Sequence, residues 1–114
     1  MLLFLFLFGL VFRVHAWNFT DPKVVEDYVL YIAHKEDVPA QLAWDIAKCE
    51  SKFNPLAIGD NGNSYGVFQI HLPSHPYITK EQAINPAWNA NWAISQMSLG
   101  KFSMWSCFKQ RAML

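Results

Sequence analysis

Residues 46–71 read IAKCESKFNPLAIGDNGNSYGVFQIH, and several kinds of local structure follow one another along this stretch. Its first residues continue a pattern of apolar side chains at helical spacing that runs as far as Cys49. A proline comes directly after Asn54, and a residue that precedes proline avoids the helical region. We therefore predict a helix that starts near Pro39 and stops before Asn54, with Glu50 in its last turn.

The rest of the stretch divides into a turn-rich part and a β-prone part. Residues 54–64 contain two glycines, three asparagines, an aspartate and a proline, which predicts a loop of tight turns. Residues 65–72 contain Val67, Phe68 and Ile70, which favour extended structure. We expect a short strand or an extended wall beside a cleft there.

The remainder of the chain is predicted to be helical and to form a single domain around one core. Asp21 and Pro22 supply the start of a helix over about 22–36, and Thr79 with Gln82 forms a capping box for a short helix. Further helices are expected from Asn85-Pro86 to a stop at Gly100, and at the C-terminus around Trp105 and Phe108.

The N-terminus, MLLFLFLFGLVFRVHA, is predicted to be a signal peptide over residues 1–16. Its apolar run from Leu2 to Phe12 is shorter than the roughly 20 residues that a membrane-spanning helix needs. Cleavage after Ala16 would release a mature domain of residues 17–114, secreted or periplasmic and associated with the cell wall. The alternatives for this leader are an uncleaved membrane anchor and a core element of the folded domain.

Charge and cysteine content narrow the possible partners. Nine basic and nine acidic residues, without a basic cluster, argue against nucleic acid as a partner.

In an exported chain the pair Cys49 and Cys107 most simply forms a disulfide, the alternative being two separate buried thiols. Two distant cysteines and scattered histidines, His71 and His75 among them, do not predict a metal site. No cofactor and no membrane insertion after leader removal are expected, and the mature protein is expected to be a monomer.

Glu50 has the setting of a catalytic acid. Cleavage of a glycosidic bond needs a carboxyl group that still carries its proton near neutral pH. Burial at the edge of the apolar stripe and the negative end of the helix dipole should both raise the pKa of Glu50. Lys52 would oppose both effects on the pKa if its ammonium group approached the carboxylate. Without further evidence, a glutamate at a helix end is usually a solvated surface residue.

Four elements follow in order along the stretch: Glu50-Ser51, Phe53-Asn54-Pro55, Gly59-Asp60-Asn61-Gly62 and Gly66-Val67-Phe68-Gln69. Together they resemble the lytic transglycosylase (SLT-type) domain of the lysozyme-like superfamily, marked by Glu-Ser, Phe-Asn-Pro and Gly-x-x-Gln. The similarity extends over about Val24 to Phe108. It implies an α+β, mostly α-helical, lysozyme-like fold with a small extended segment beside the catalytic cleft.

The resemblance implies cleavage of peptidoglycan between N-acetylmuramic acid and N-acetylglucosamine, with Glu50 as sole general acid and base. It implies that Gln69 lines the sugar cleft and that Ser51 supports Glu50 or a sugar acetamido group. A glycine also lets a sugar ring or a neighbouring strand approach closely. The full set of predicted substrate contacts is Ser51, Ser64, Tyr65, Gly66 and Gln69.

Two alternatives stay open. Asp60 either shapes the turn or acts as a second carboxylate, in which case a hydrolytic lysozyme becomes the better description. The domain could also bind peptidoglycan without cleaving it. One departure from the family pattern lies at Met104–Phe108, where such domains commonly carry Ala-Tyr-Asn and this chain has no Tyr-Asn pair.

Overall fold

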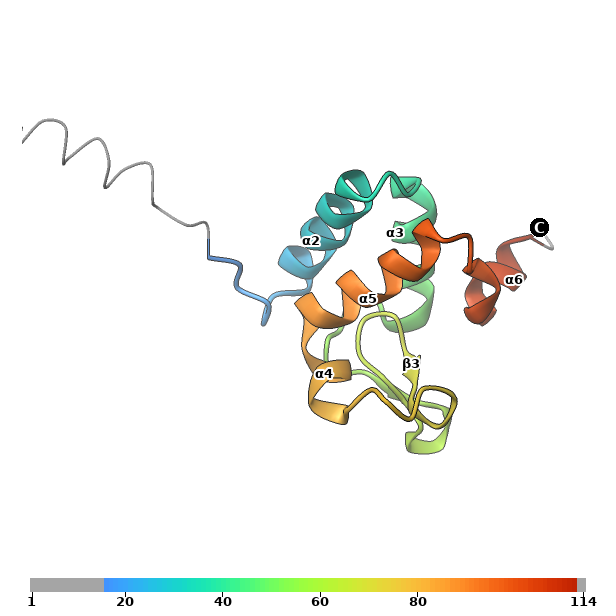
Figure 1. The fold of residues 1–114 in the computed structure, drawn as a ribbon. Coiled ribbons are helices and arrows are strands. Elements are labelled where there is room, and N and C mark those ends of the chain that lie inside the picture. The colour runs from blue at the N-terminus through green and yellow to red at the C-terminus, as the bar shows by residue number, and fades with distance from the viewer. Residues whose placement is uncertain (1–15, 113–114) are drawn as a thin grey trace, which may run out of the picture.

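In the computed structural model, which describes residues 16–112, two helices pack side by side and a third lies across them (Figure 1). These are α2 (Pro22–Lys35), α3 (Ala40–Ser51) and α5 (Pro86–Ser98). The Asp21 side chain accepts the N–H of Lys23 at the start of α2, which confirms the predicted cap. The helix α3 ends where Lys52 adopts a left-handed conformation with φ 54°, before the Asn-Pro pair.

A small antiparallel sheet follows α3, with strands in the order β1 (Ile58–Gly59), β2 (Ser64–Tyr65) and β3 (Ile70–His71). Ile58 pairs with Tyr65, and Tyr65 pairs with Ile70. The short 3-10 helix η1 (Asp60–Gly62) connects β1 to β2. The predicted turn-rich loop therefore contains one of the strands.

The prediction of an extended segment over residues 65–72 is wrong in its middle. A turn interrupts it: the N–H of Gln69 donates to the carbonyl of Gly66 at 3.1 Å. Val67 and Phe68 lie in this turn and are fully buried in the helical core. Their apolar character reflects burial between helices rather than a place in a strand, and composition alone does not separate these two causes.

The second half of the chain is built of short helices. The helix α4 (Lys80–Ile84) begins with the predicted capping box of Thr79 and Gln82. The remaining elements are η2 (Leu72–Ser74), η3 (Phe102–Met104) and α6 (Ser106–Ala112). Figure 1 shows α6 beyond the end of α5, on the side of α3, which it contacts.

Buried side chains form a main core and a smaller one. The main core lies between α2, α3 and α5 and includes Val29, Ile46, Phe68 and Ile94. The smaller core joins the sheet to α4 through Ile70, Ile78 and Ala83. The predicted fold class, α+β and mostly α-helical with a small extended part, is confirmed.

Apart from Ala16, the predicted leader lies outside the described residues. Between residues 16 and 112, none of the helices has the length and apolar character needed to cross a membrane.

Candidate active site

Glu50 lies at the C-terminal end of α3 and is partly buried. The backbone N–H of Cys107 donates to its Oε2 at 3.4 Å. Burial is the largest influence and raises the pKa of Glu50, the Cys107 N–H opposes it, and the negative charge of Asp60 raises the pKa further. Lys52 is exposed and does not contribute, so the predicted direction of the pKa shift is confirmed.

Ser51 joins the end of α3 to the turn over residues 66–69. Its hydroxyl donates to the carbonyl of Val67 at 2.7 Å and also lies 3.3 Å from the carbonyl of Ala47. The hydroxyl is thus directed at backbone carbonyls rather than at the carboxyl of Glu50. In this position Ser51 fixes the distance between the catalytic candidate and the Gly-x-x-Gln turn.

Gln69 ends the turn in a left-handed conformation with φ 47°. Its side-chain amide donates to the carbonyls of Ala57 and Gly66, both at 3.0 Å. Gly59 allows this arrangement, because a Cβ there would overlap Oε1 of Gln69. Gln69 therefore closes the turn against the residue that precedes β1, and it also lies in the wall of a pocket.

Asp60 and Ser64 form a polar pair within the sheet region. The Ser64 side chain is 1 % exposed, and its hydroxyl donates to Oδ2 of Asp60 at 2.5 Å. Asp60 is exposed and has φ 49°. The pair stabilises the β1–β2 connection, as the turn interpretation of Asp60 predicts, and also brings a carboxylate close enough to influence Glu50.

Tyr65 and Gly66 lie where the sheet meets α4 and α5. The Tyr65 hydroxyl donates to the carbonyl of Gly62 at 2.7 Å, and the Lys80 ammonium lies 5.3 Å from the centre of its ring. Gly66 has φ 82°, and a Cβ on it would overlap the carbonyl of Ala83 and the side chain of Asn89. The close approach predicted at Gly66 is therefore made by protein.

Comparison with protein-family models identifies the kind of domain to which this helix-end glutamate and the turn after it belong. Residues 27–101 match the family model described as Transglycosylase SLT domain. The chain belongs to this family. No curated protein and no solved structure matches the chain. SLT domains are of the lytic transglycosylase type, act on peptidoglycan and are typically glycosidases.

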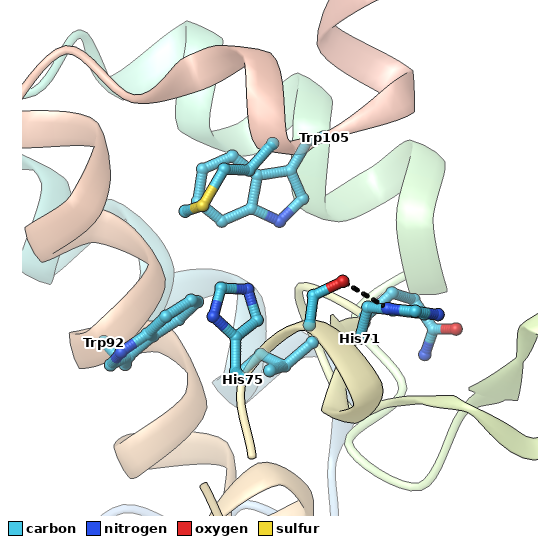
Figure 2. Close-up of a pocket in the computed structure, with 8 residues that line it drawn as sticks. His71, His75, Trp92 and Trp105 are labelled. Atoms are coloured by element: carbon cyan, nitrogen blue, oxygen red, sulfur yellow. Dashed lines mark hydrogen bonds between the residues drawn. The ribbon is translucent and has the colours of Figure 1, made fainter. Parts of the chain in front are cut away.

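A pocket of about 230 Å³ lies next to the motif of this SLT domain (Figure 2). Trp105 stands on one side of it and His75 and Trp92 stand on the other. The rings of His75 and Trp92 are 4.9 Å apart, and burial, more than the charge of His71, lowers the pKa of His75. Glu50 is not in the pocket wall, but Gln69 and Trp105 are, and both belong to segments that adjoin Glu50.

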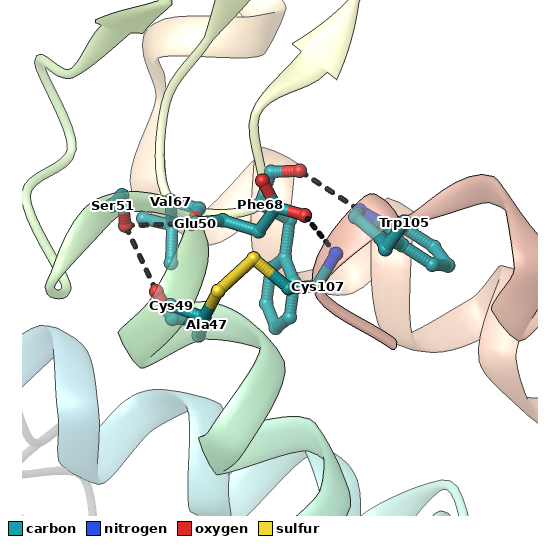
Figure 3. The surroundings of a disulfide bond; sticks show 8 residues. All are labelled: Ala47, Cys49, Glu50, Ser51, Val67, Phe68, Trp105 and Cys107. Atoms are coloured by element: carbon teal, nitrogen blue, oxygen red, sulfur yellow. Dashed lines mark hydrogen bonds between the residues drawn. A yellow bond between two sulfur atoms is a disulfide. The ribbon is translucent and has the colours of Figure 1, made fainter. Parts of the chain in front are cut away.

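The predicted disulfide between Cys49 and Cys107 is present (Figure 3). Trp105, which is 4 % exposed, donates its indole N–H to the carbonyl of Phe68 at 2.8 Å. The late element Met104–Phe108 therefore reaches both the Gly-x-x-Gln turn and Glu50 although it lacks a Tyr-Asn pair. It lies beyond the part of the chain that matches the family model.

Sequence reasoning missed Asn89, a fully buried residue of α5. Its side chain accepts the N–H of Phe68 at 2.9 Å and donates to the carbonyls of Tyr65 and Ala83 at 3.1 and 2.8 Å. A signal was available, because an asparagine among the apolar residues of a helix core must find hydrogen-bond partners there. Asn89 organises the turn that carries the family motif.

Within residues 16–112 the His, Cys, Asp and Glu side chains do not gather in any group of three or more that would suit a metal ion.

Proposed function

We propose that the chain is an exported peptidoglycan lytic transglycosylase in which Glu50 serves as both general acid and general base. The observation that carries the proposal is the partly buried Glu50 carboxyl with a raised pKa, at the end of α3 beside the family motif. A raised pKa keeps a population of protonated carboxyl groups at the pH where the enzyme acts. Export is supported by the leader-like residues 1–16 and by the disulfide, and residues 17–114 would form the mature domain.

The proposed reaction uses one carboxyl group twice. Protonated Glu50 donates its proton to the glycosidic oxygen as the bond between that oxygen and C1 of N-acetylmuramic acid breaks. The carboxylate left behind then accepts the proton of the C6 hydroxyl of the same sugar, whose oxygen bonds to C1. A 1,6-anhydro sugar results, no water is consumed, and Glu50 is again protonated.

The pocket beside the motif is suited to hold the glycan next to the cleaved bond. Trp92 offers an apolar ring face on which a sugar can stack, and the largely buried Trp105 closes one side of the pocket. His71 and Ser74 add polar groups linked by a hydrogen bond of 2.7 Å. Gln69 lines this pocket and ends the turn that Ser51 joins to the helix of Glu50, so it is retained in the proposal as a substrate contact. Tyr65 is partly exposed beside the motif and is retained with it.

The contacts of three predicted substrate residues support a different role in the proposal. Ser51 and Ser64 direct their hydroxyls at protein groups, and Gly66 is enclosed by α4 and α5. We assign these residues to shaping the motif turn. The substrate then meets the turn mainly through Gln69 and through the aromatic residues of the pocket.

One observation favours a second candidate, the hydrolytic lysozyme. The charge of Asp60 is near enough to raise the pKa of Glu50, so Asp60 is positioned to influence the reaction centre. Against direct participation, Oδ2 of Asp60 already accepts the Ser64 hydroxyl. We therefore assign Asp60 to the turn and expect Asp60→Asn to retain anhydro-forming activity.

Mass spectrometry of muropeptides released from purified peptidoglycan tests the proposal. Products with 1,6-anhydro ends are expected from the wild-type protein and from Asp60→Asn. Reducing ends that depend on Asp60 would show a hydrolase instead. Intact peptidoglycan that retains bound protein, without released products, would show a binding module and contradict the proposed activity.

A further inference from the structure

We infer that the Cys49–Cys107 disulfide positions the catalytic carboxyl group by holding the backbone N–H of Cys107 against Glu50. The inference rests on the proposed function of Glu50 and adds Cys49 and Cys107 to it as positioning residues. Neither cysteine reacts with substrate in this account. The backbone N–H, rather than a side chain, is the group that touches the carboxyl.

The disulfide begins at the residue before Glu50 and ends at the residue whose N–H reaches Glu50. Figure 3 shows the bridge between α3 and the start of α6, with the carboxyl of Glu50 next to the Cys107 amide. The two cysteines are 58 positions apart in the sequence, so only the covalent bond fixes these two backbone points directly to each other. The disulfide therefore sets the distance at which the N–H meets Oε2.

Other contacts hold the same segment less directly. Trp105 fixes the residue two positions before Cys107 through its indole bond to the Phe68 carbonyl, and its ring packs edge-on against Phe68 at 6.2 Å. On the far side of Cys107, Phe108 packs against Phe102 at 5.3 Å, and both side chains also pack against the main core. Among the described contacts the disulfide is thus the covalent link between α6 and the helix that carries Glu50, beside the packing of α6 on α3.

The positioned amide has a chemical role in the proposed reaction. It donates to the charged form of the carboxyl and so lowers the pKa that burial and Asp60 raise. Glu50 must give up its proton in the first step and then hold its charge until it accepts another. A fixed donor stabilises that charged state and orients the Oε2 atom, which neither burial nor the charge of Asp60 does.

The experiment compares kcat/KM for peptidoglycan as a function of pH in the oxidised protein and in the double variant Cys49→Ala/Cys107→Ala. The alkaline limb of this profile reports the loss of the proton from Glu50. In the double variant we expect that limb to move upward by about 0.5 to 1 pH unit, as loss of one hydrogen bond to the carboxylate requires. An unchanged limb in the folded double variant overturns the inference.

A matched control separates positioning from stability. Gly100→Ala weakens the fold through its positive φ of 81° without touching the site, because nothing lies within 4 Å of the new Cβ. Its alkaline limb should coincide with that of the wild-type protein. A shift of equal size in Gly100→Ala would show that any destabilisation moves the limb, and would also overturn the inference.

A second measurement uses the disulfide-bonded protein itself and does not depend on the double variant folding. The amide proton resonance of Cys107 should follow the titration of Glu50 in nuclear magnetic resonance spectra, and this titration should vanish in Glu50→Gln. A Cys107 amide that does not titrate contradicts the inference. Absence of any product from the wild-type protein would instead contradict the proposed function, so the two failures are distinguishable.

Discussion

Substitution of Gly66 by alanine tests whether this glycine is required by the protein or by the substrate. Gly66 has φ 82°, and a Cβ there would overlap the Ala83 carbonyl and the Asn89 amide. Gly100 offers a matched control, since its φ is 81° and nothing lies within 4 Å of an added Cβ. Both variants place an alanine at a positive φ, but only the alanine at position 66 also overlaps neighbouring atoms.

The expected cost at Gly66 has two parts. A left-handed conformation costs a non-glycine residue about 1–2 kcal/mol, and both variants lose this amount. At Gly66 the Asn89 side chain must also move away from its bonds to Tyr65 and Ala83. A buried polar group left without its partner costs about 1–3 kcal/mol, so we expect Gly66→Ala to lose about 2–5 kcal/mol of unfolding free energy in all.

Urea denaturation followed by circular dichroism measures both variants against the wild-type protein. Gly66→Ala should be less stable than Gly100→Ala by about 1–3 kcal/mol, the cost of the displaced hydrogen bonds. Equal losses would refute the reasoning, because they would mean that α4 and α5 yield to the new methyl group. Gly66 would then again be a candidate for direct approach by a sugar ring.

Two further predictions concern buried polar groups. Asn89→Ala should lose about 3 kcal/mol or more in the same denaturation assay, because Phe68 loses its acceptor, whereas Asn91→Ala, at an exposed site of the same helix, should lose less than about 1 kcal/mol. In the folded wild-type protein the pKa of Glu50 lies above its ordinary value of 4.5, so ionisation of Glu50 destabilises the fold as pH rises. The variant Glu50→Gln does not ionise and lacks this effect. The unfolding free energy of Glu50→Gln relative to that of the wild-type protein should therefore increase with pH above 4.5 and stay constant below it, as urea denaturation at several pH values would measure. A difference that does not change with pH would contradict the raised pKa.

Local sequence rules predicted the features that depend on neighbouring residues. The caps at Asp21 and Thr79 and the end of α3 before Asn54 follow from short-range hydrogen bonding and from proline geometry. The place of Glu50 in the last turn follows from the same rules, and its environment follows from the apolar stripe beside it. These parts of the site could be predicted because each requires only a few consecutive residues.

Features that depend on distant segments were predicted less well. Val67 and Phe68 were expected to be extended, but the helical core buries them in a turn that Asn89 holds from another helix. The pairing of the buried Ser64 with Asp60 across a turn was not anticipated, and the role of Ser64 as a substrate contact stays a prediction. The Cys107 N–H that reaches Glu50 is a backbone atom, so no side-chain motif could have indicated it.

The most direct test of the central claim is the rate at which muropeptides are released from purified peptidoglycan by Glu50→Gln. Its matched control is Glu36→Gln, which makes the same chemical change at an exposed position after α2. If Glu50 is the sole general acid and base, as proposed, Glu50→Gln should lower the rate by at least about 10²-fold, while Glu36→Gln should retain the wild-type rate. Release by Glu50→Gln at the rate of Glu36→Gln would contradict the assignment of catalysis to Glu50.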